Sequence, residues 1–320
     1  MKKMFFIYLI LLFTLFIYIP ITLAYTDSIV TGVDNNKTNN LGTNVTILGQ
    51  GVGGGLLYNS TIIFTSVLGQ SMVIGNNKLM MASTTNFTVW NLSSNKVLCS
   101  FQVLIDTYGP GGYFDTSNGI YITSLGSSVS FQAINVTTCT QYWLNNDPST
   151  ANPTFIVGSN IYNKYYLTDK AALYEVNKVN GKTNWSIAGI ATGGNAIGGL
   201  STDGYRIFVI DPGASRLFAF NASAVSGQIW NWTSTVPILG QAVLDESRET
   251  VYIRTNTNSI FALNKTTGGV LWNNTVGANF IGPIALVDDL LIFNQGQTNL
   301  TAYNITSQSK KWTVTGSVGL

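Results

Sequence analysis

Apolar and polar positions alternate along most of this chain in short runs, and the runs recur with a long, fixed period. Six times an apolar stretch ends on Asn, a short turn follows, and a further strand begins that in five copies ends on Trp. The clearest copies read IFALNKTTGGVLW, LYEVNKVNGKTNW and LTAYNITSQSKKW. The steps between copies are 44, 42, 44, 43 and 40 residues, measured between the repeat asparagines Asn91, Asn135, Asn177, Asn221, Asn264 and Asn304. This period is typical of β-propeller blades.

Each period contains four strand signals that are rich in β-branched and aromatic residues. In the fifth period they read GQAVLDE, SRETVYIRT, SIFALN and GGVLWNNT. The second strand is apolar on both faces in every copy, as expected for a sheet stacked between two others. A single blade would expose those faces to water, so we predict one closed ring and one domain.

The number of blades depends on residues 25–68, which amount to 44 residues, or one period. They lack the repeat motif and contain the glycine-rich run LGQGVGGG. We expect a degenerate blade there, for an all-β propeller of seven four-stranded blades. The alternative is that strands such as STIIFTSVL complete the last blade, and rings of six or eight blades stay open.

The N-terminus has the order of a secretory signal peptide. Lys2 and Lys3 precede an apolar run, and small residues stand before the expected cleavage after Ala24. We therefore predict a signal peptide over residues 1–24 and a propeller domain over residues 25–320. An uncleaved membrane anchor is the alternative, and in both cases the remaining chain leaves the cytoplasm.

Charged residues make up only 9% of the chain, and without Lys2 and Lys3 basic and acidic residues are equal in number. This composition argues against nucleic acid and anionic lipid as partners. Sequons for N-glycosylation occur at 13 positions. In a secreted chain we expect a glycoprotein, with sugar on the repeat asparagines that are sequons: Asn91, Asn135, Asn221, Asn264 and Asn304.

The repeat resembles the tryptophan-docking motif of PQQ-like (quinoprotein-like) repeats, Ala-x-Asp-x-x-x-Gly-x-x-x-Trp. Ala262, Gly268 and Trp272 match it, and Asn264 replaces the Asp. The resemblance covers about residues 69–320. It implies that each Trp packs between the Ala place of its own motif and the Gly place of the next. We therefore expect five buried tryptophans, namely Trp143, Trp185, Trp230, Trp272 and Trp312.

The same resemblance gives the two cysteines a role. Cys99 falls in the Trp place of the first motif, and Cys139 falls in the Gly place of the second. These places touch across a blade boundary in the family, so the resemblance implies a disulfide between them. The alternative is two unrelated buried thiols.

Chemistry for catalysis is scarce. The chain has no His, and its two cysteines are 40 residues apart, whereas quinoprotein alcohol dehydrogenases often have an adjacent Cys pair beside the quinone. We assign no catalytic, cofactor-binding or metal-binding residue. The predicted function is a secreted or cell-surface, non-catalytic binding or scaffolding module. The alternative is an oxidoreductase that depends on a quinone and calcium.

The sequons predict which face of the propeller binds a protein or glycan partner. The five repeat sequons stand in the turn between third and fourth strands, so glycans would crowd that face. We expect partners at the opposite face, whose loops include LTDKAA and IDPGASR. The candidate contact residues are Asp169, Lys170, Asp211 and Arg216.

Overall fold

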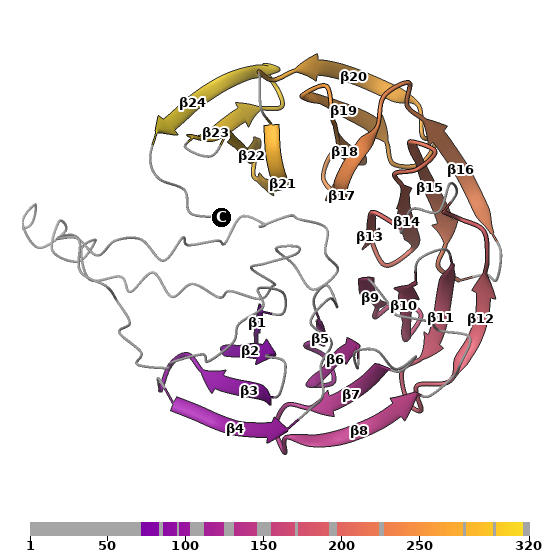
Figure 1. The fold of residues 1–320 in the computed structure, drawn as a ribbon, viewed down its shortest axis with the longest axis vertical. Coiled ribbons are helices and arrows are strands. Elements are labelled where there is room, and N and C mark those ends of the chain that lie inside the picture. The colour runs from indigo at the N-terminus through magenta and orange to yellow at the C-terminus, as the bar shows by residue number, and fades with distance from the viewer. Residues whose placement is uncertain are drawn as a thin grey trace, which may run out of the picture.

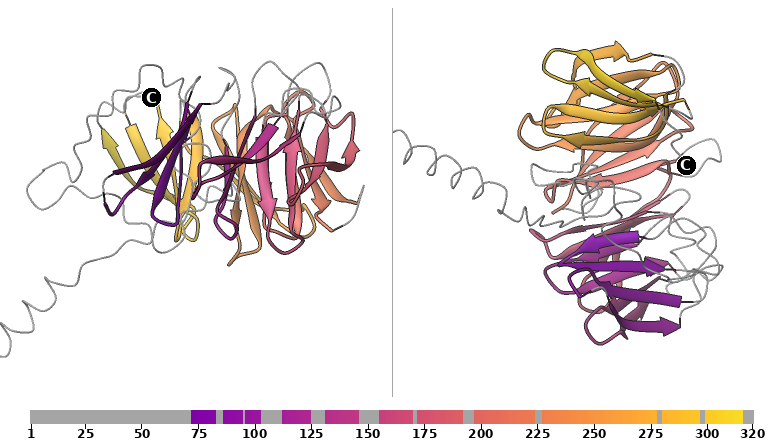
Figure 2. Two further views of the ribbon diagram at one scale, coloured as in Figure 1. Left: turned by 90° about the horizontal axis from the view of Figure 1, so that it is seen from below. Right: turned by 90° about the vertical axis from the view of Figure 1, so that its left-hand side faces the viewer.

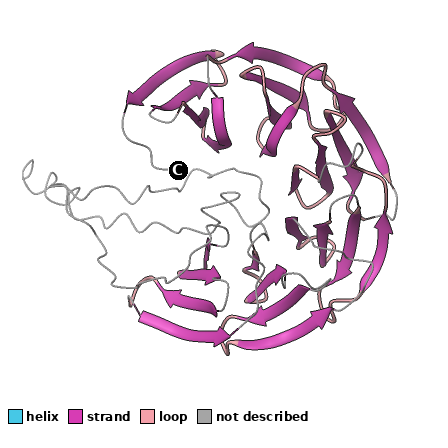
Figure 3. Ribbon diagram, viewed as in Figure 1, coloured by secondary structure: helices cyan, strands magenta, loops and turns pink. Residues whose placement is uncertain are grey.

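The computed structural model describes residues 72–82, 86–94, 96–102, 112–124, 131–145, 155–169, 172–191, 197–223, 227–277, 280–296 and 299–315. These residues form six four-stranded antiparallel sheets, with strands and turns and no helix among them (Figure 3). The predicted all-β propeller is confirmed. The signal peptide and the seventh, N-terminal blade fall on residues outside the described ones, so both stay predictions.

Each sheet is one blade, and we number the blades 1 to 6 in chain order. Blades 1 to 3 comprise β1 (Met72–Gly75), β2 (Lys78–Ala82), β3 (Asn86–Asn91) and β4 (Lys96–Gln102); β5 (Tyr113–Asp115), β6 (Ile120–Ser124), β7 (Phe131–Asn135) and β8 (Thr140–Asn145); and β9 (Phe155–Ser159), β10 (Lys164–Thr168), β11 (Leu173–Asn177) and β12 (Thr183–Ile187). Blades 4 to 6 comprise β13 (Gly199–Thr202), β14 (Arg206–Asp211), β15 (Arg216–Asn221) and β16 (Gln228–Thr233); β17 (Ile238–Asp245), β18 (Thr250–Thr255), β19 (Ser259–Asn264) and β20 (Val270–Thr275); and β21 (Phe280–Val287), β22 (Leu290–Gln295), β23 (Asn299–Asn304) and β24 (Ser309–Thr315).

The blades stand side by side around an open arc, with the first strand of each toward the centre and the fourth at the rim (Figure 1). Figure 2 shows the resulting disc from its edge. Every blade is an antiparallel meander, so its connections fall on two faces of the disc. We call the face with the first-to-second and third-to-fourth turns the turn face. The loop face carries the second-to-third connections and the links between blades.

The hydrophobic core lies between the blades. Each of five buried clusters combines the facing sides of two consecutive blades, from blades 1 and 2 through to blades 5 and 6. The second strands of blades 2 to 5 are buried on both faces, and β18 is buried along its whole length. This agrees with the doubly apolar pattern of these strands in the sequence, since a blade between two others has no solvent-facing side.

The tryptophan docking is seen most clearly between blades 2 and 3. Trp143 pairs with Ala133 of its own blade and is 7% exposed. Its indole Nε1 donates a hydrogen bond to the Lys178 carbonyl oxygen of blade 3, over 2.9 Å. Gly181 has a φ of +70°, and a Cβ there would lie 2.4 Å from the Trp143 ring. Only glycine combines this backbone conformation with so close an approach.

Blades 4 and 5 repeat this junction. Trp230 is 8% exposed, its Nε1 donates to the Lys265 carbonyl oxygen over 3.1 Å, and its ring lies against Gly268. The predicted docking is therefore confirmed at two junctions.

Three tryptophans depart from this arrangement. Trp185 is buried, but its Nε1 donates to the carboxylate of Glu175, which stands in the Ala place of the same blade. Trp272 and Trp312 are partly exposed, so the prediction of five buried tryptophans holds for three. In front of Trp272 the Gly place is filled by Gln308, whose amide oxygen accepts a hydrogen bond from Asn274 over 3.1 Å. A side chain at this position prevents the Trp272 ring from packing directly on the backbone, as the Trp143 and Trp230 rings do at glycine.

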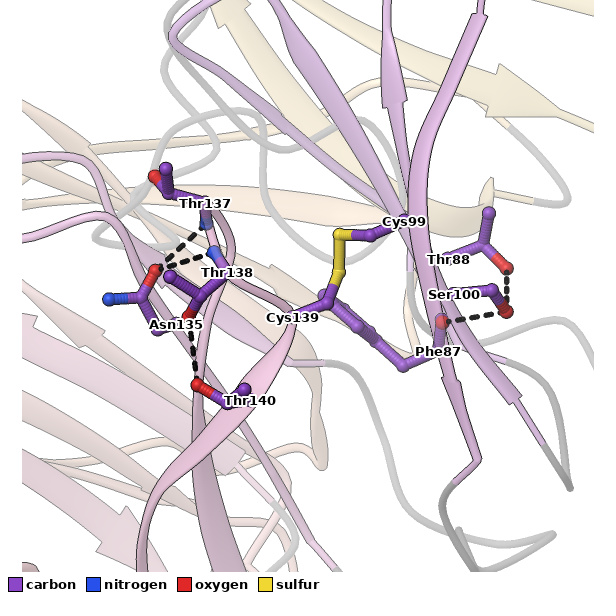
Figure 4. Close-up of a disulfide and its surroundings, with 9 residues drawn as sticks. All are labelled: Phe87, Thr88, Cys99, Ser100, Asn135, Thr137, Thr138, Cys139 and Thr140. Carbon is purple, nitrogen blue, oxygen red and sulfur yellow. Dashed lines mark hydrogen bonds between the residues drawn. A yellow bond between two sulfur atoms is a disulfide. The ribbon is translucent and has the colours of Figure 1, made fainter.

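The two cysteines form the predicted disulfide between blades 1 and 2 (Figure 4). Cys99 lies opposite Val89 in blade 1, just as Trp143 lies opposite Ala133 in blade 2. Cys99 therefore occupies the Trp place of its blade. Cys139 has a φ of +52° and takes the left-handed conformation of Gly181. The Cα atoms of Cys99 and Cys139 are 6.0 Å apart, so the bond fits the ordinary distance between two docking places.

Candidate functional site

The third-to-fourth turns of the turn face are built on the repeat asparagines. The Oδ1 atom of Asn135 accepts hydrogen bonds from the backbone nitrogens of Thr137 and Thr138, over 2.9 and 3.2 Å (Figure 4). Asn264 accepts equivalent bonds from Thr266 and Thr267. An Asp oxygen would serve this turn equally well, which explains why the family motif has Asp in the same place.

The geometry of these turns is compatible with glycosylation. The turn uses the Oδ1 atom of the asparagine, whereas N-linked sugar attaches to Nδ2. In all five sequons, the Ser or Thr two positions after the asparagine is exposed; Thr137 and Thr266 are two examples. Glycans on Asn91, Asn135, Asn221, Asn264 and Asn304 therefore stay a prediction that the turn geometry permits. The turn of blade 3 differs, since Asn177 is followed by Lys178 and Val179 and is no sequon.

Exposed apolar side chains gather beside this sequon-free turn. Ile161 is 49% exposed, Val179 63% and Tyr205 57%. The ring of Tyr205 meets the ring of Tyr162 edge-on, with centroids 6.3 Å apart, and Ile161 lies against Gly204. We call Ile161, Tyr162, Val179 and Tyr205 the apolar turn patch. They belong to the turns β9–β10, β11–β12 and β13–β14, so the patch joins blades 3 and 4.

A buried ionic network lies beneath the patch. The Lys178 side chain is only 3% exposed, and its Nζ donates to Asp115 Oδ2 over 2.8 Å and to Asn160 Oδ1 over 2.7 Å. The same Asp115 oxygen accepts a hydrogen bond from the Tyr165 hydroxyl over 2.8 Å. The Asn160 contact ties the two turns of blade 3 together, and the Asp115 contact reaches back to blade 2. The network therefore fixes the backbone from which Ile161 and Val179 project.

Electrostatics favour the charged form of Asp115. Burial alone would raise the pKa of Asp115, but the hydrogen bonds from Lys178 and Ser117 outweigh it and lower the pKa to about 2. Burial lowers the pKa of Lys178, and the nearby Asp115 carboxylate opposes that shift. The pKa of the Tyr165 hydroxyl is raised by burial and by the Asp115 charge. Tyr165 therefore acts as a hydrogen-bond donor and Asp115 as an acceptor.

Lys265 occupies the same repeat position in blade 5, and its side chain is 1% exposed. It forms ion pairs with Glu246, with Glu249 over 3.3 Å, and with Asp203 of blade 4 over 3.4 Å. In the other later blades this position holds the buried apolar residues Val136, Ala222 and Ile305. Two lysines thus replace apolar residues at alternate blades. The sequence analysis missed both, although the apolar residues in the aligned copies mark the position as buried.

On the loop face, the predicted contact residues are engaged within their own loops. The Asp169 carboxylate accepts hydrogen bonds from the Ala172 nitrogen and the Tyr174 hydroxyl, each over 2.6 Å. Asp211 is fully buried and accepts bonds from the backbone nitrogens of Gly213 and Ala214.

Arg216 pairs with Asp211 over 3.3 Å, lies over the Phe218 ring and leaves 32% of its side chain exposed. Lys170 lies outside the described residues. Of the predicted residues that the structure describes, Arg216 therefore offers the most surface to a partner.

Within the described part of the chain, the carboxylates do not form a centre for a quinone and calcium. Among the described residues, no three His, Cys, Asp or Glu side chains gather in a group that could hold a metal ion. Asp115, Asp211 and Asp245 each accept hydrogen bonds within a turn. Cys99 and Cys139 join two blades and are not adjacent in the chain, unlike the Cys pair that often flanks the quinone in quinoprotein alcohol dehydrogenases. The described residues therefore show no site that fits such a cofactor.

Comparisons with known proteins agree with the fold. Residues 224–319 match the family model described as outer membrane protein assembly factor BamB. The crystal structure of BamB from Moraxella catarrhalis is similar with a TM-score of 0.58 and 13% sequence identity, over 75% of this chain and 73% of that one. This chain has the fold of a PQQ-like β-propeller. No curated protein matches its sequence.

The fold alone does not assign a role to this chain. Propellers serve many functions through their surface loops, so an assignment has to come from the faces of the disc. No helix within the described part of the chain is long and apolar enough to span a membrane.

Proposed function

We propose that this propeller is a non-catalytic protein-binding module that works outside the cytoplasm, and that its partner docks on the apolar turn patch. The observation that carries the proposal is the exposure of Ile161, Val179 and Tyr205 in neighbouring turns. Burying such side chains against a partner removes apolar surface from water, which is a main driving force of protein association. Their position on the buried Lys178 network means that little backbone ordering is needed on binding.

The chemistry of the patch favours a protein over a sugar. Ile161 and Val179 have aliphatic side chains that form no hydrogen bonds, whereas a sugar presents hydroxyl groups that need donors and acceptors. Tyr162 and Tyr205 add rigid aromatic surface of the kind that is enriched in protein interfaces. The similarity to BamB, which is described as an outer membrane protein assembly factor, is compatible with a protein-binding role.

The sequons support both the location and the choice of surface. A signal peptide over residues 1–24 would send the chain out of the cytoplasm, where sugar could be added to the repeat asparagines. Five of the six third-to-fourth turns are sequons, and only the turn at Asn177 is not. Glycans on the other five would cover much of the turn face, whereas the blade 3 turn that carries Val179 would have none.

The loop face is the competing surface, because Lys170 and Arg216 were predicted there as partner contacts. The two faces can be compared by photo-crosslinking with the full chain at the cell surface. A photo-crosslinking amino acid replaces Tyr205 on the turn face in one variant and Arg216 on the loop face in another. We expect one protein to crosslink from position 205 and none from position 216. Crosslinks from position 216 alone, or from neither position, would contradict the proposal.

The crosslinked protein is then purified and its affinity measured by calorimetry. Ile161→Ser should weaken binding by about tenfold or more, as is usual for an apolar residue at the centre of an interface. Val270→Ser is the matched control, because Val270 is 48% exposed on the rim strand β20 of blade 5, a blade that contributes no residue to the patch. Equal loss of affinity in both variants would point to a non-specific apolar contact and not to this surface.

The quinone-dependent alternative has no observation in its favour. Its test is the addition of quinone and calcium to purified protein, followed by an assay for dye-linked alcohol or sugar oxidation. We expect no activity above that of the heat-denatured protein. Saturable activity that requires both additions would replace the binding proposal with a catalytic one.

A further inference from the structure

The two ends of the arc differ from every junction inside it. In each blade, the second-strand residue opposite the Ala place faces the following blade. In blades 1 to 5 this residue is at most 1% exposed, and it is Met80, Ile122, Tyr166, Phe208 or Tyr252. The equivalent Ile292 in blade 6 is partly exposed. This position is therefore buried in blades 1 to 5 but partly exposed in blade 6.

Most other large side chains on that face of blade 6 are also apolar and partly exposed, although Ala302 is buried and Asn294 is polar. Ile292 pairs with Ala302, which pairs with Trp312, so the three side chains lie on one face of the sheet. Val287, Leu290 and Leu300 share this face and are partly exposed, and Val314 is 58% exposed. The other face of blade 6 packs against blade 5 through Leu291, Phe293 and Tyr303, which are nearly fully buried.

Blade 1 shows the same asymmetry with the faces reversed. Met80, Phe87 and Val89 face blade 2 and are fully buried. On the opposite face Leu79 pairs with Trp90, which pairs with Val97. Leu79 and Trp90 are partly exposed and Val97 is 47% exposed. The residues equivalent to Leu79 and Trp90 in blade 2, Tyr121 and Ile134, are fully buried.

These two faces border the same opening. Blade 6 turns its uncovered face away from blade 5, and blade 1 turns its uncovered face away from blade 2. In the arc of blades, both directions lead into the opening between blade 6 and blade 1 (Figure 1). Two half-covered apolar faces that confront each other across one opening require an element that is apolar on both sides.

We propose that residues 25–68 of the same chain cover both faces as a seventh blade. The segment has 44 residues, which matches the steps of 40 to 44 residues between the repeats. It precedes β1 directly in the chain, so chain order around the ring places it between blade 6 and blade 1. Its run STIIFTSVL, residues 60–68, has the β-branched and aromatic composition of a blade strand. Closing the ring in this way leaves no unpaired blade face.

Hydrogen–deuterium exchange of the full chain, read by mass spectrometry, tests the proposal. Peptides that cover residues 60–68 should exchange at least about 100-fold more slowly than an unstructured peptide of the same sequence. Ile292→Asp places a charge on the covered face of blade 6 and should remove most of this protection. Leu271→Asp is the matched control, because Leu271 is 52% exposed on the rim of blade 5 and the substitution should leave the protection unchanged.

A second variant guards against misfolding of Ile292→Asp. Phe64→Asp alters the segment and none of the six described blades, and it should speed exchange in peptides that contain Leu79 or Ile292. Light scattering on the same samples reports the mass. Rapid exchange of residues 60–68 in the unaltered protein would overturn the proposal. Protection that appears only as a dimer forms would overturn it too, because a second copy would then cover the faces.

Discussion

The junction between blades 1 and 2 and the junction between blades 2 and 3 use the same two places of the repeat with different chemistry. At the first, Cys99 and Cys139 are joined by a disulfide; at the second, the Trp143 ring lies on Gly181. Cys139 and Gly181 share a left-handed backbone conformation. The repeat thus determines where neighbouring blades touch, and the residues in those places decide whether the contact is covalent or packed.

The largest expected effect comes from removing the packed contact. Trp143→Ala should lower the free energy of unfolding by about 3–5 kcal/mol, because it leaves a large cavity. It also leaves the buried Lys178 carbonyl without its indole donor. Urea denaturation followed by circular dichroism measures the loss. Tyr142→Ala is the control, since Tyr142 is 49% exposed on the same strand and should cost less than about 0.5 kcal/mol. Similar losses for both would mean that the docking place is not special.

Removal of the covalent contact should have a slightly smaller effect that depends on redox conditions. The bond closes a sequence separation of 40 residues. A loop of this length corresponds to about 3–4 kcal/mol of stabilisation in the loop-entropy model. Cys99→Ser should show this loss, and reducing agent should destabilise the unaltered protein but not the variant. Native alkylation that labels both thiols under oxidising conditions would show that the bond does not form.

The need for glycine at the packed junction can be tested by comparing Gly181 with Gln308, the residue at the same place in blade 6. Gly181→Ala should cost about 2–3 kcal/mol, because the new Cβ meets the Trp143 ring and alanine disfavours a positive φ. Gln308 occupies the same place in blade 6 with a φ of +50°. Gln308→Ala should change stability by less than about 0.5 kcal/mol, since its side chain is exposed. Equal effects in thermal unfolding would refute the role given to close approach.

The smallest expected effect is a pH dependence at the packed junction. The folded pKa of Asp115, about 2, is lower than the ordinary value of 3.8. Its stabilisation is therefore complete above about pH 4 and is lost as pH falls toward 2. The loss amounts to about 2 kcal/mol.

The double variant Asp115→Asn, Lys178→Met replaces the buried pair with neutral groups and should abolish this step in acid unfolding curves. Asp288→Asn, at an exposed turn residue, should retain it. An unchanged step in the double variant would assign the pH dependence to other carboxylates.

The contrast between the two junctions could largely be predicted from sequence. The repeat spacing aligned Cys99, Cys139, Trp143 and Gly181 with the motif, and the resemblance to PQQ-like repeats implied that these are docking places. The partial exposure of Trp272 was not predicted, since the Gln308 side chain that removes its seat comes from the next blade. The buried lysines were missed because Lys after Asn in a turn is usually solvated, and only the surrounding blades remove the water.

For this protein, the sequence by itself determined the blade period and the asparagine turns, and the family resemblance of its motif implied the pairing of the cysteines. These are properties of one repeat or of adjacent repeats, so local patterns are enough to show them. Only the tertiary structure decided that Lys178 meets Asp115 and that Ile161, Val179 and Tyr205 share one exposed surface. Those contacts join turns from different blades, and their positions depend on how the sheets stack, which the chain specifies only when it is folded.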